Sequence, residues 1–267
     1  MQNFNGKVVW ITGASSGYGE AVAKAFAGTG AKLVISARRA EKLNQLAKEL
    51  GNAVVVPLDL AKFDTFDQKA KEAVDAFGHI DIVMHNGAIA QNATVMETSL
   101  AVERRIMDVD YFSHTDLNRA LLPYMLERDS GQIVVVSGLL AHIAAPRRAT
   151  YAAAKAALIA YFDSLRAELL GKNIDVTVLI PGAMQTGLVA TAVQADGKPD
   201  TTKSGFISPN GVTLDEAARQ TLTFIAEKRK QAFVGLHDAS YQLWQLTRAD
   251  PEKGIQMLLD KMKEAAN

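Results

Sequence analysis

The chain has 267 residues, of which 48% are hydrophobic and 22% are charged, the composition of an ordinary globular protein. Its 29 lysine and arginine residues balance 29 aspartate and glutamate residues, so no net charge attracts the protein to nucleic acid or to an anionic membrane. The lack of cysteine excludes disulfides, thiolate metal ligands and a cysteine nucleophile, and it fits a reducing compartment.

The sequence pattern shows neither a membrane span nor an export signal. No apolar run reaches the roughly 18 residues that a membrane span needs. Residues 1–7 are polar and lead straight into an apolar segment, without the basic and then apolar pattern of a signal peptide. We therefore expect a cytoplasmic protein with no membrane and no nucleic-acid partner, and we predict no metal site.

Short β-branched runs alternate with longer segments of helical periodicity along most of the chain. This alternation predicts β-α-β units and a parallel sheet with helices on both faces. The predicted strands are residues 8–12, 32–36, 53–58, 80–85, 132–137, 175–180 and 231–234. The predicted helices are residues 17–28, 40–50, 63–77, 99–128, 150–170, 213–230, 240–247 and 251–265. Because we find no internal repeat and no linker, we interpret residues 1–267 as one α/β domain with a doubly wound sheet of about seven strands.

One stretch interrupts this alternation. Between residues 187 and 213, Gly, Pro, Asp, Lys and Ser dilute the apolar pattern over a length that exceeds ordinary connections. Long segments of this kind inside a domain are usually lids or binding loops. We predict that residues 187–213 form a loop that covers the substrate.

The first predicted strand leads into a turn with three glycines, Gly13, Gly17 and Gly19. A turn from strand to helix with little side-chain bulk lets backbone amides approach a pyrophosphate, and the helix N-terminus adds a favourable dipole. The pattern therefore indicates a dinucleotide site. The alternative is a tight turn that needs glycine for its geometry only.

The second predicted strand ends at two arginines, Arg38 and Arg39, and the first acidic residue beyond them is Glu41. A dinucleotide fold that prefers NAD presents an acid to the ribose hydroxyls at this point, whereas arginine clasps the 2′-phosphate of NADP. Alternatively, the two arginines are solvated residues at the start of a helix. We favour NADP(H) over NAD(H).

A tyrosine and a lysine stand four residues apart in a predicted helix, at Tyr151 and Lys155. This spacing places both on one helix face, where the lysine charge favours the phenolate and lowers the tyrosine pKa from about 10 toward working pH. Such a tyrosine can give a proton to the alkoxide that forms when a carbonyl is reduced. On its own, a pair at this spacing is usually a snorkelling surface pair.

Several motifs together resemble those of the classical short-chain dehydrogenases/reductases. They are the glycine turn, Asn86, the segment from Tyr151 to Lys155 and the segment from Pro181 to Thr186, in the order that the family has. The surrounding sequence is similar to the branch that contains hydroxysteroid dehydrogenases. The resemblance implies a Rossmann-type fold and hydride transfer between a nicotinamide cofactor and a carbonyl or alcohol substrate, with Tyr151 as acid and base.

The resemblance also implies which residues bind the cofactor. Arg38 is at the position that commonly contacts the 2′-phosphate, with Ser16 nearby, and Asp59 is at the position that meets the adenine. For Asp59, capping of the following helix is an equal alternative. The full predicted set is Gly13, Ser15, Ser16, Gly17, Tyr18, Gly19, Arg38, Arg39, Asp59, Asn86, Tyr151, Lys155, Pro181, Gly182 and Thr186.

The serine that relatives use to hydrogen-bond the substrate oxygen is replaced by Gly138. The neighbouring Ser137 could take over this role only if the backbone rotates, because adjacent strand residues face opposite ways. A glycine at position 138 would permit such a rotation. His114 and His142 are either replacements for the serine or ordinary histidines of a helix and a loop.

The asparagine of the family pattern is also replaced, by Asp110. In relatives the main-chain carbonyl of that residue helps to hold a water linked to the lysine, so part of the role is independent of the side chain. A carboxylate so near Lys155 would nevertheless alter the charge balance of the site. A milder change is Asn86-Gly87-Ala88 where Asn-Ala-Gly is usual. We expect that change to adjust packing around the nicotinamide.

Three functional hypotheses follow. The first is an NADP(H)-dependent oxidoreductase that interconverts a carbonyl and an alcohol, with Tyr151, Lys155, Ser137 and Asp110 as catalytic candidates. The second is a cofactor-binding protein with little or no turnover, motivated by Gly138 and Asp110. The third is isomerisation or dehydration on the same fold. Relatives pair through the helices that correspond to residues 99–128 and 150–170, so we expect a homodimer or homotetramer.

Overall fold

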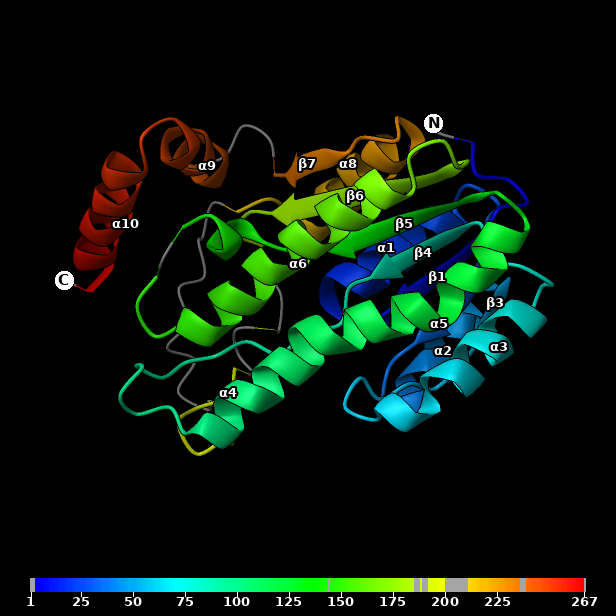
Figure 1. Cartoon of the computed structure of the whole chain (residues 1–267), viewed down its shortest axis with the longest axis horizontal. Coiled ribbons are helices and arrows are strands. Elements are labelled where there is room, and N and C mark those ends of the chain that lie inside the picture. Colours follow the sequence, from blue (N-terminus) through cyan, green and yellow to red (C-terminus); the bar gives the residue numbers. More distant parts are fainter. Residues whose placement is uncertain are drawn as a thin grey trace.

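Seven parallel strands form one sheet in the part of the chain that the structure describes (Figure 1). The computed structural model describes residues 3–143, 145–184, 188, 192–199, 211–235 and 239–266. The strand order is β3-β2-β1-β4-β5-β6-β7. The strands are β1 (Val8–Thr12), β2 (Lys32–Ser36), β3 (Ala53–Val55), β4 (Ile82–His85), β5 (Gly131–Val136), β6 (Ile174–Pro181) and β7 (Gln231–Val234).

Helices cover both faces of this sheet. They include α1 (Gly17–Ala27), α2 (Ala40–Leu50), α3 (Phe66–Asp75), α4 (Leu100–Met107), α5 (Ser113–Glu127), α6 (Ala149–Glu168), α8 (Leu214–Ala226), α9 (Ala239–Ala249) and α10 (Pro251–Ala266). In β1, Val9 and Ile11 pack in one core with α1, α2 and α8, whereas Val8 and Trp10 pack in another with α3, α5 and α6. Figure 1 shows α5 and α6 lying across one face. The predicted doubly wound sheet is therefore confirmed.

Most strand ends match the predictions, and the differences have local causes. The strand predicted from residue 80 begins at Ile82, and just before it the Asp81 amide donates to the Val8 carbonyl while the Asp81 side chain accepts the Val8 amide, both at 2.9 Å. The strand predicted for residues 53–58 ends at Val55. The chain nevertheless stays alongside β2 beyond that point, since the amides of Val56 and Leu58 still donate to backbone carbonyls there.

The single helix predicted for residues 99–128 is interrupted. Between α4 and α5, residues Asp108–Phe112 form a π-helical turn, η2. π-Helical turns inside α-helices frequently occur at functional sites. Here the turn contains Asp110, which is completely buried. The departure from a regular helix therefore coincides with the residue that departs from the family pattern.

The candidate site lies at the carboxyl edge of the sheet. In a doubly wound sheet, ligands bind beyond the carboxyl ends of the strands, where the strand order reverses direction, which here is between β1 and β4. The short 3₁₀ helix η3 (Leu139–Ala141) follows β5 at this edge and leads toward α6. Behind it, Ile143 packs with Leu243 of α9 and Leu258 of α10. Among the described residues, no helix combines the length and the apolar character that crossing a membrane requires.

Candidate active site

The turn between β1 and α1 is packed so closely that a side chain at Gly13 or Gly19 would clash with neighbouring backbone atoms. Gly13 has a φ of +67°, and a Cβ atom there would lie 2.8 Å from the Cα of Gly87. A Cβ atom at Gly19 would lie 2.6 Å from the carbonyl oxygen of Gly13. Gly17, the first residue of α1, has a φ of +59°. The glycines thus meet the geometric demand of a tight turn and also bring bare backbone to the helix N-terminus.

The N-terminus of α1 has its free backbone amides available for an anion. Its N-cap residue, Ser16, makes no side-chain capping bond. Instead, the Ser16 hydroxyl accepts a hydrogen bond from Arg39. Uncapped amides and the helix dipole together favour a phosphate, so this turn fits the pyrophosphate of a dinucleotide. The side chain of Tyr18 turns away into the core and hydrogen-bonds Thr221, which leaves its backbone as the part near the turn.

Arg39 is the arginine that the structure brings to the glycine turn. Its guanidinium donates to the Ser15 hydroxyl at 2.9 Å and to the Ser16 hydroxyl at 2.7 Å. A further bond of 3.3 Å reaches the carbonyl of Ser15. Arg38, the position that the family resemblance favours, is exposed and is not brought to the turn by any contact of the described residues. A cationic fork therefore lies beside the predicted phosphate site through Arg39.

Asn86 and Asp59 both make local contacts that shape the site. The Asn86 side chain donates to the carbonyls of Thr12 and Gly13, at 3.1 and 3.4 Å, and so ties the end of β4 to the glycine turn. The Asp59 carboxylate accepts the Ala61 amide at 3.1 Å, which forms a local turn. Asp59 does not cap the following helices, because Lys62 and Thr65 are their N-cap residues. Binding of the adenine by Asp59 stays a prediction.

The segment Asn86-Gly87-Ala88, where Asn-Ala-Gly is usual, lies against Leu60 and the glycine turn. A Cβ atom at Gly87 would lie 2.5 Å from the Cδ1 atom of Leu60, the end of a flexible side chain, so an alanine there would require that side chain to shift. The carbonyl of Gly87 accepts from the ring of His114 at 2.8 Å. His114 is therefore engaged beneath the turn, and His142 packs against Trp244 with ring centroids 6.2 Å apart.

The segment after β6 contributes part of the predicted set. Gly182 donates its amide to the Val234 carbonyl at 2.9 Å, and a Cβ atom there would lie 2.9 Å from the ring of Phe233. Pro181 ends β6 beside it. Thr186 lies outside the described residues.

The predicted substrate-covering loop, residues 187–213, also lies largely outside the described residues. Its described part, residues 192–199, runs beside residues 90–92, where Val193 exchanges backbone hydrogen bonds with Ala90 and Asn92. Val193 packs with Val102, Ile106 and Tyr151 in one apolar cluster. This part of the segment therefore contacts the catalytic candidate.

Tyr151 and Lys155 share the face of α6 that is turned toward the sheet, so they are not a surface pair. Lys155 is 1% exposed, and its ammonium lies 5.7 Å from the centre of the Tyr151 ring. The Lys155 ammonium also donates to the Val136 carbonyl at 3.4 Å. At the start of the helix, the side chain of Gln91 accepts the amides of Thr150 and Tyr151, at 2.9 and 3.3 Å. Gln91 holds the first turn of α6, and no motif in the sequence indicates it.

The structure places Gly138, rather than Ser137, beside the Tyr151 hydroxyl. A Cβ atom at Gly138 would lie 3.9 Å from the Tyr151 oxygen, and no other atom of the described residues, apart from its chain neighbours, would be as near. The Ser137 hydroxyl donates to the carbonyl of Lys155 at 2.8 Å. The Gly138 backbone is extended, with φ 166°, so it provides no rotation that would redirect Ser137. The Ser137 hydroxyl, which was the candidate to replace the family serine, is thus bonded to the backbone of α6.

Buried charge surrounds Lys155. Asp110 is completely buried, and its Oδ2 atom lies 3.6 Å from the Lys155 ammonium. Burial raises the pKa of Asp110 to about 6, against the lowering effect of Lys155. Burial also raises the pKa of Tyr151, and the Asp110 charge raises it further. Burial lowers the pKa of Lys155, which Asp110 opposes. In the protein without cofactor, burial therefore outweighs the lowering of the tyrosine pKa that the spacing predicts.

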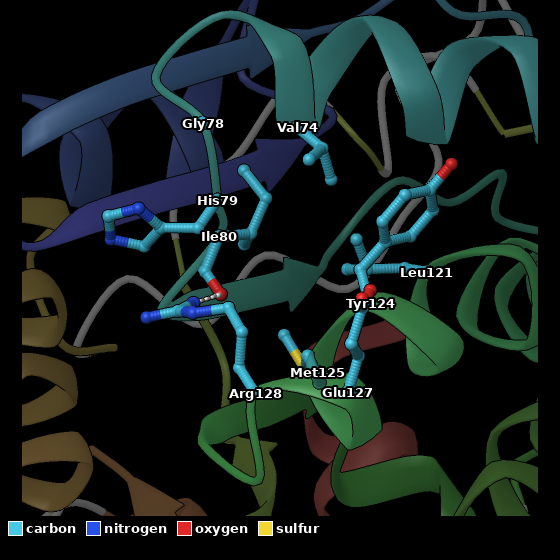
Figure 2. A pocket seen from close by; sticks show the side chains of 9 residues that line it. All are labelled: Val74, Gly78, His79, Ile80, Leu121, Tyr124, Met125, Glu127 and Arg128. Carbon is cyan, nitrogen blue, oxygen red and sulfur yellow. Dashed lines mark hydrogen bonds between the residues drawn. The ribbon is translucent and has the colours of Figure 1, made fainter.

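A separate pocket of about 300 Å³ lies at the opposite edge of the sheet (Figure 2). It is lined by the ends of α3 and α5 and by the segment before β4, including Val74, Ile80 and Leu121. Arg128 donates to the Ile80 carbonyl at 3.3 Å beside it. Because ligands of doubly wound sheets bind beyond the carboxyl ends of the strands, we do not assign the cofactor to this pocket.

The sheet order and the glycine turn define the class: a Rossmann-type protein whose fold binds a nicotinamide dinucleotide. The family model described as short chain dehydrogenase matches residues 7–197. Dehydrogenase/reductase SDR family member 7B of Mus musculus is 37% identical over 238 residues, which are 85% of this chain and 72% of the relative. Dehydrogenase/reductase SDR family protein 7-like of Anopheles gambiae is 37% identical over 246 residues, 87% of this chain and 76% of the relative. The chain therefore belongs to the short-chain dehydrogenase/reductase family of oxidoreductases, as the motifs predicted.

Solved structures share the fold. A short-chain dehydrogenase/reductase from Burkholderia phymatum in complex with NAD has a TM-score of 0.81 at 23% identity, with 94% of this chain and 96% of that chain covered. An alcohol dehydrogenase from Thermococcus sibiricus complexed with 5-hydroxy-NADP has a TM-score of 0.74 at 23% identity, with 87% and 97% covered. One neighbour is thus described with NAD and the other with an NADP derivative.

Proposed function

We propose that this protein is an NADP(H)-dependent oxidoreductase that interconverts a carbonyl and an alcohol, with Tyr151 as the group that gives and takes the proton. The observation that carries the proposal is the pairing of Tyr151 with Lys155 on the inner face of α6, at the sheet edge where the glycine turn lies. A tyrosine and a buried lysine at this edge match the needs of proton transfer beside a bound dinucleotide.

The chain's own residues supply binding and proton chemistry. When bound, the nicotinamide supplies or accepts a hydride. The α1 N-terminus and the bare backbone of the glycine turn bind the pyrophosphate. Tyr151 gives its proton to the carbonyl oxygen as that oxygen gains charge, and the Lys155 ammonium, held at the Val136 carbonyl, favours the phenolate that remains. Burial of this pair limits the access of water.

The preference for NADP(H) rests in our proposal on Arg39. Replacing Arg39 with alanine is expected to weaken NADPH binding about 10- to 100-fold with little change for NADH, because a charge-assisted hydrogen bond to a phosphate contributes about 1.5–3 kcal/mol. Titration of both cofactors by calorimetry measures this. Arg38→Ala is the matched control, since Arg38 is the adjacent exposed arginine, and only Arg39 bonds Ser15 and Ser16 among the described residues. If the wild type binds NADH and NADPH equally, the preference is wrong; if only Arg38→Ala loses NADPH affinity, Arg38 is the contact.

A second candidate function is cofactor binding with little turnover. The specific observation in its favour is Gly138, which lies beside the Tyr151 hydroxyl and has no side chain that could donate a hydrogen bond there. A donor aimed at a developing oxyanion typically contributes about 10² to 10³ in rate, so its loss leaves a slow enzyme or a binding protein. Substitution of Gly138 separates these two outcomes.

We also propose that two copies pair through α5 and α6. Ala156 and Ala160 are exposed on α6, and Phe112, just before α5, is 48% exposed. Small residues permit close approach of a second helix, and an exposed phenylalanine favours burial in an interface. Replacing Ala160 with arginine is expected to convert a dimer or tetramer to smaller species in light scattering after gel filtration. A wild-type monomer at micromolar concentration would contradict the pairing.

A further inference from the structure

Asp110 and Lys155 form an ion pair that is closed off from solvent. Asp110 is 0% exposed and Lys155 is 1% exposed. The Oδ1 atom of Asp110 accepts the Ile89 amide at 2.8 Å, which fixes the carboxylate. Its Oδ2 atom has no hydrogen-bond partner among the described residues and faces the Lys155 ammonium at 3.6 Å. The carboxylate is therefore oriented by the backbone after β4 and directed at the lysine.

Among the described residues around Lys155, Asp110 is the one buried acidic side chain, and the other buried titratable neighbours are histidines. From β4 and α5, His85 and His114 pack against each other with ring centroids 5.7 Å apart. Burial lowers the pKa of both rings, that of His85 to about 4, so both are uncharged at neutral pH. From α4, Glu103 accepts the Thr150 hydroxyl at 3.3 Å at the partly exposed start of α6.

Burial raises the pKa of Tyr151, and two charged groups modify it. Asp110 raises it further, because a nearby negative charge disfavours the phenolate, whereas Arg148, just before α6, lowers it. The Lys155 ammonium lies 5.7 Å from the centre of the Tyr151 ring. Since the pKa of Asp110 is about 6, this carboxyl is mostly ionised above that pH and mostly neutral below it. The Asp110 charge therefore disfavours the Tyr151 phenolate throughout the neutral range.

We propose that Asp110 is a positioning residue whose buried carboxylate holds Lys155 in place and adds its charge to the burial that keeps the Tyr151 hydroxyl protonated, so that the resting site carries the proton that carbonyl reduction consumes. This inference rests on the proposed acid–base function of Tyr151. An asparagine at position 110 would keep an acceptor for the Ile89 amide but would remove the charge. The aspartate therefore adds electrostatic control to a purely structural contact.

The first test is the pH profile of alcohol oxidation, which requires the phenolate. In Asp110→Asn, the pH at which kcat/KM for oxidation reaches half its plateau is expected to fall by about one unit, because the variant removes a charge that raises the Tyr151 pKa and a nearby like charge typically shifts a pKa by about that amount. Asp108→Asn removes the same charge from a partly exposed position on the same π-helical turn and is the matched control. An unchanged profile in Asp110→Asn would overturn the proposal.

The second test needs neither turnover nor a stable variant at position 110. Tyrosine labelled with ¹³C at Cζ is followed by NMR in the wild type from about pH 4.5 to about pH 8, and Tyr151→Phe identifies the Tyr151 signal. We expect that signal to move with a midpoint near pH 6 as Asp110 ionises. A signal that stays constant over this range overturns the proposal. If the Tyr151 signal moves near pH 6 but the protein shows no turnover, the result supports the inference about Asp110 and counts against the proposed function only.

Discussion

Replacing Tyr151 with phenylalanine is expected to lower kcat for carbonyl reduction by about 10²- to 10⁴-fold, the usual contribution of a positioned general acid. The substitution removes one hydroxyl from a ring that packs with Val102, Ile106 and Val193, so the apolar contacts of the ring stay in place. NADPH affinity should therefore change little. Steady-state rates over a panel of ketones and aldehydes, together with NADPH titration, measure both effects.

Tyr161→Phe is the matched control for this change, because it removes a hydroxyl from the same helix at a position that packs with Tyr111 and Phe162. It should leave kcat nearly unchanged. If Tyr151→Phe retained wild-type turnover, Tyr151 would not be the proton donor, and the proposed mechanism would have to be abandoned.

Replacing Gly138 with serine is expected to raise kcat by about 10²- to 10³-fold, the contribution of one donor aimed at a developing oxyanion. The backbone accepts the change, because φ at Gly138 is 166°, in the extended range. Within the part of the chain that the structure describes, a Cβ atom there meets only the Tyr151 oxygen, at 3.9 Å, which is ordinary contact. The serine hydroxyl would thus stand beside the proton donor, where a substrate oxygen must also lie. Rates of NADPH oxidation across the carbonyl panel measure the gain.

Gly138→Ala controls for the added bulk, since it supplies the Cβ atom without the hydroxyl. The alanine variant should resemble the wild type. A gain in the serine variant alone identifies an impaired enzyme, whereas vigorous turnover by the wild type contradicts the binding-protein alternative. A serine variant that is no faster than wild type would show that the missing donor does not limit this site.

The parts of the fold that the sequence predicted correctly depend on patterns between residues that are close together in the chain. The strands at 8–12 and 32–36 and the helix at 40–50 are observed with the predicted bounds, because buried β-branched runs and helical periodicity are short-range patterns. The glycine turn was likewise visible, since its residues are close in sequence. The interruption at Asp108–Phe112 was not predicted, because its residues also suit a regular helix, and the contact that fixes Asp110 comes from Ile89, distant in sequence.

The sequence by itself determined the family and the order of the elements, and it predicted Tyr151 and Lys155 as the acid–base pair, because each of these inferences depends on residue types at short spacings. Only the tertiary structure decided which side chains face the site. It placed Arg39 at the glycine turn, bonded Ser137 to α6 and left Gly138 beside the Tyr151 hydroxyl. It also closed Asp110 onto Lys155. These orientations depend on contacts between segments far apart in the chain, and no spacing within one segment encodes them.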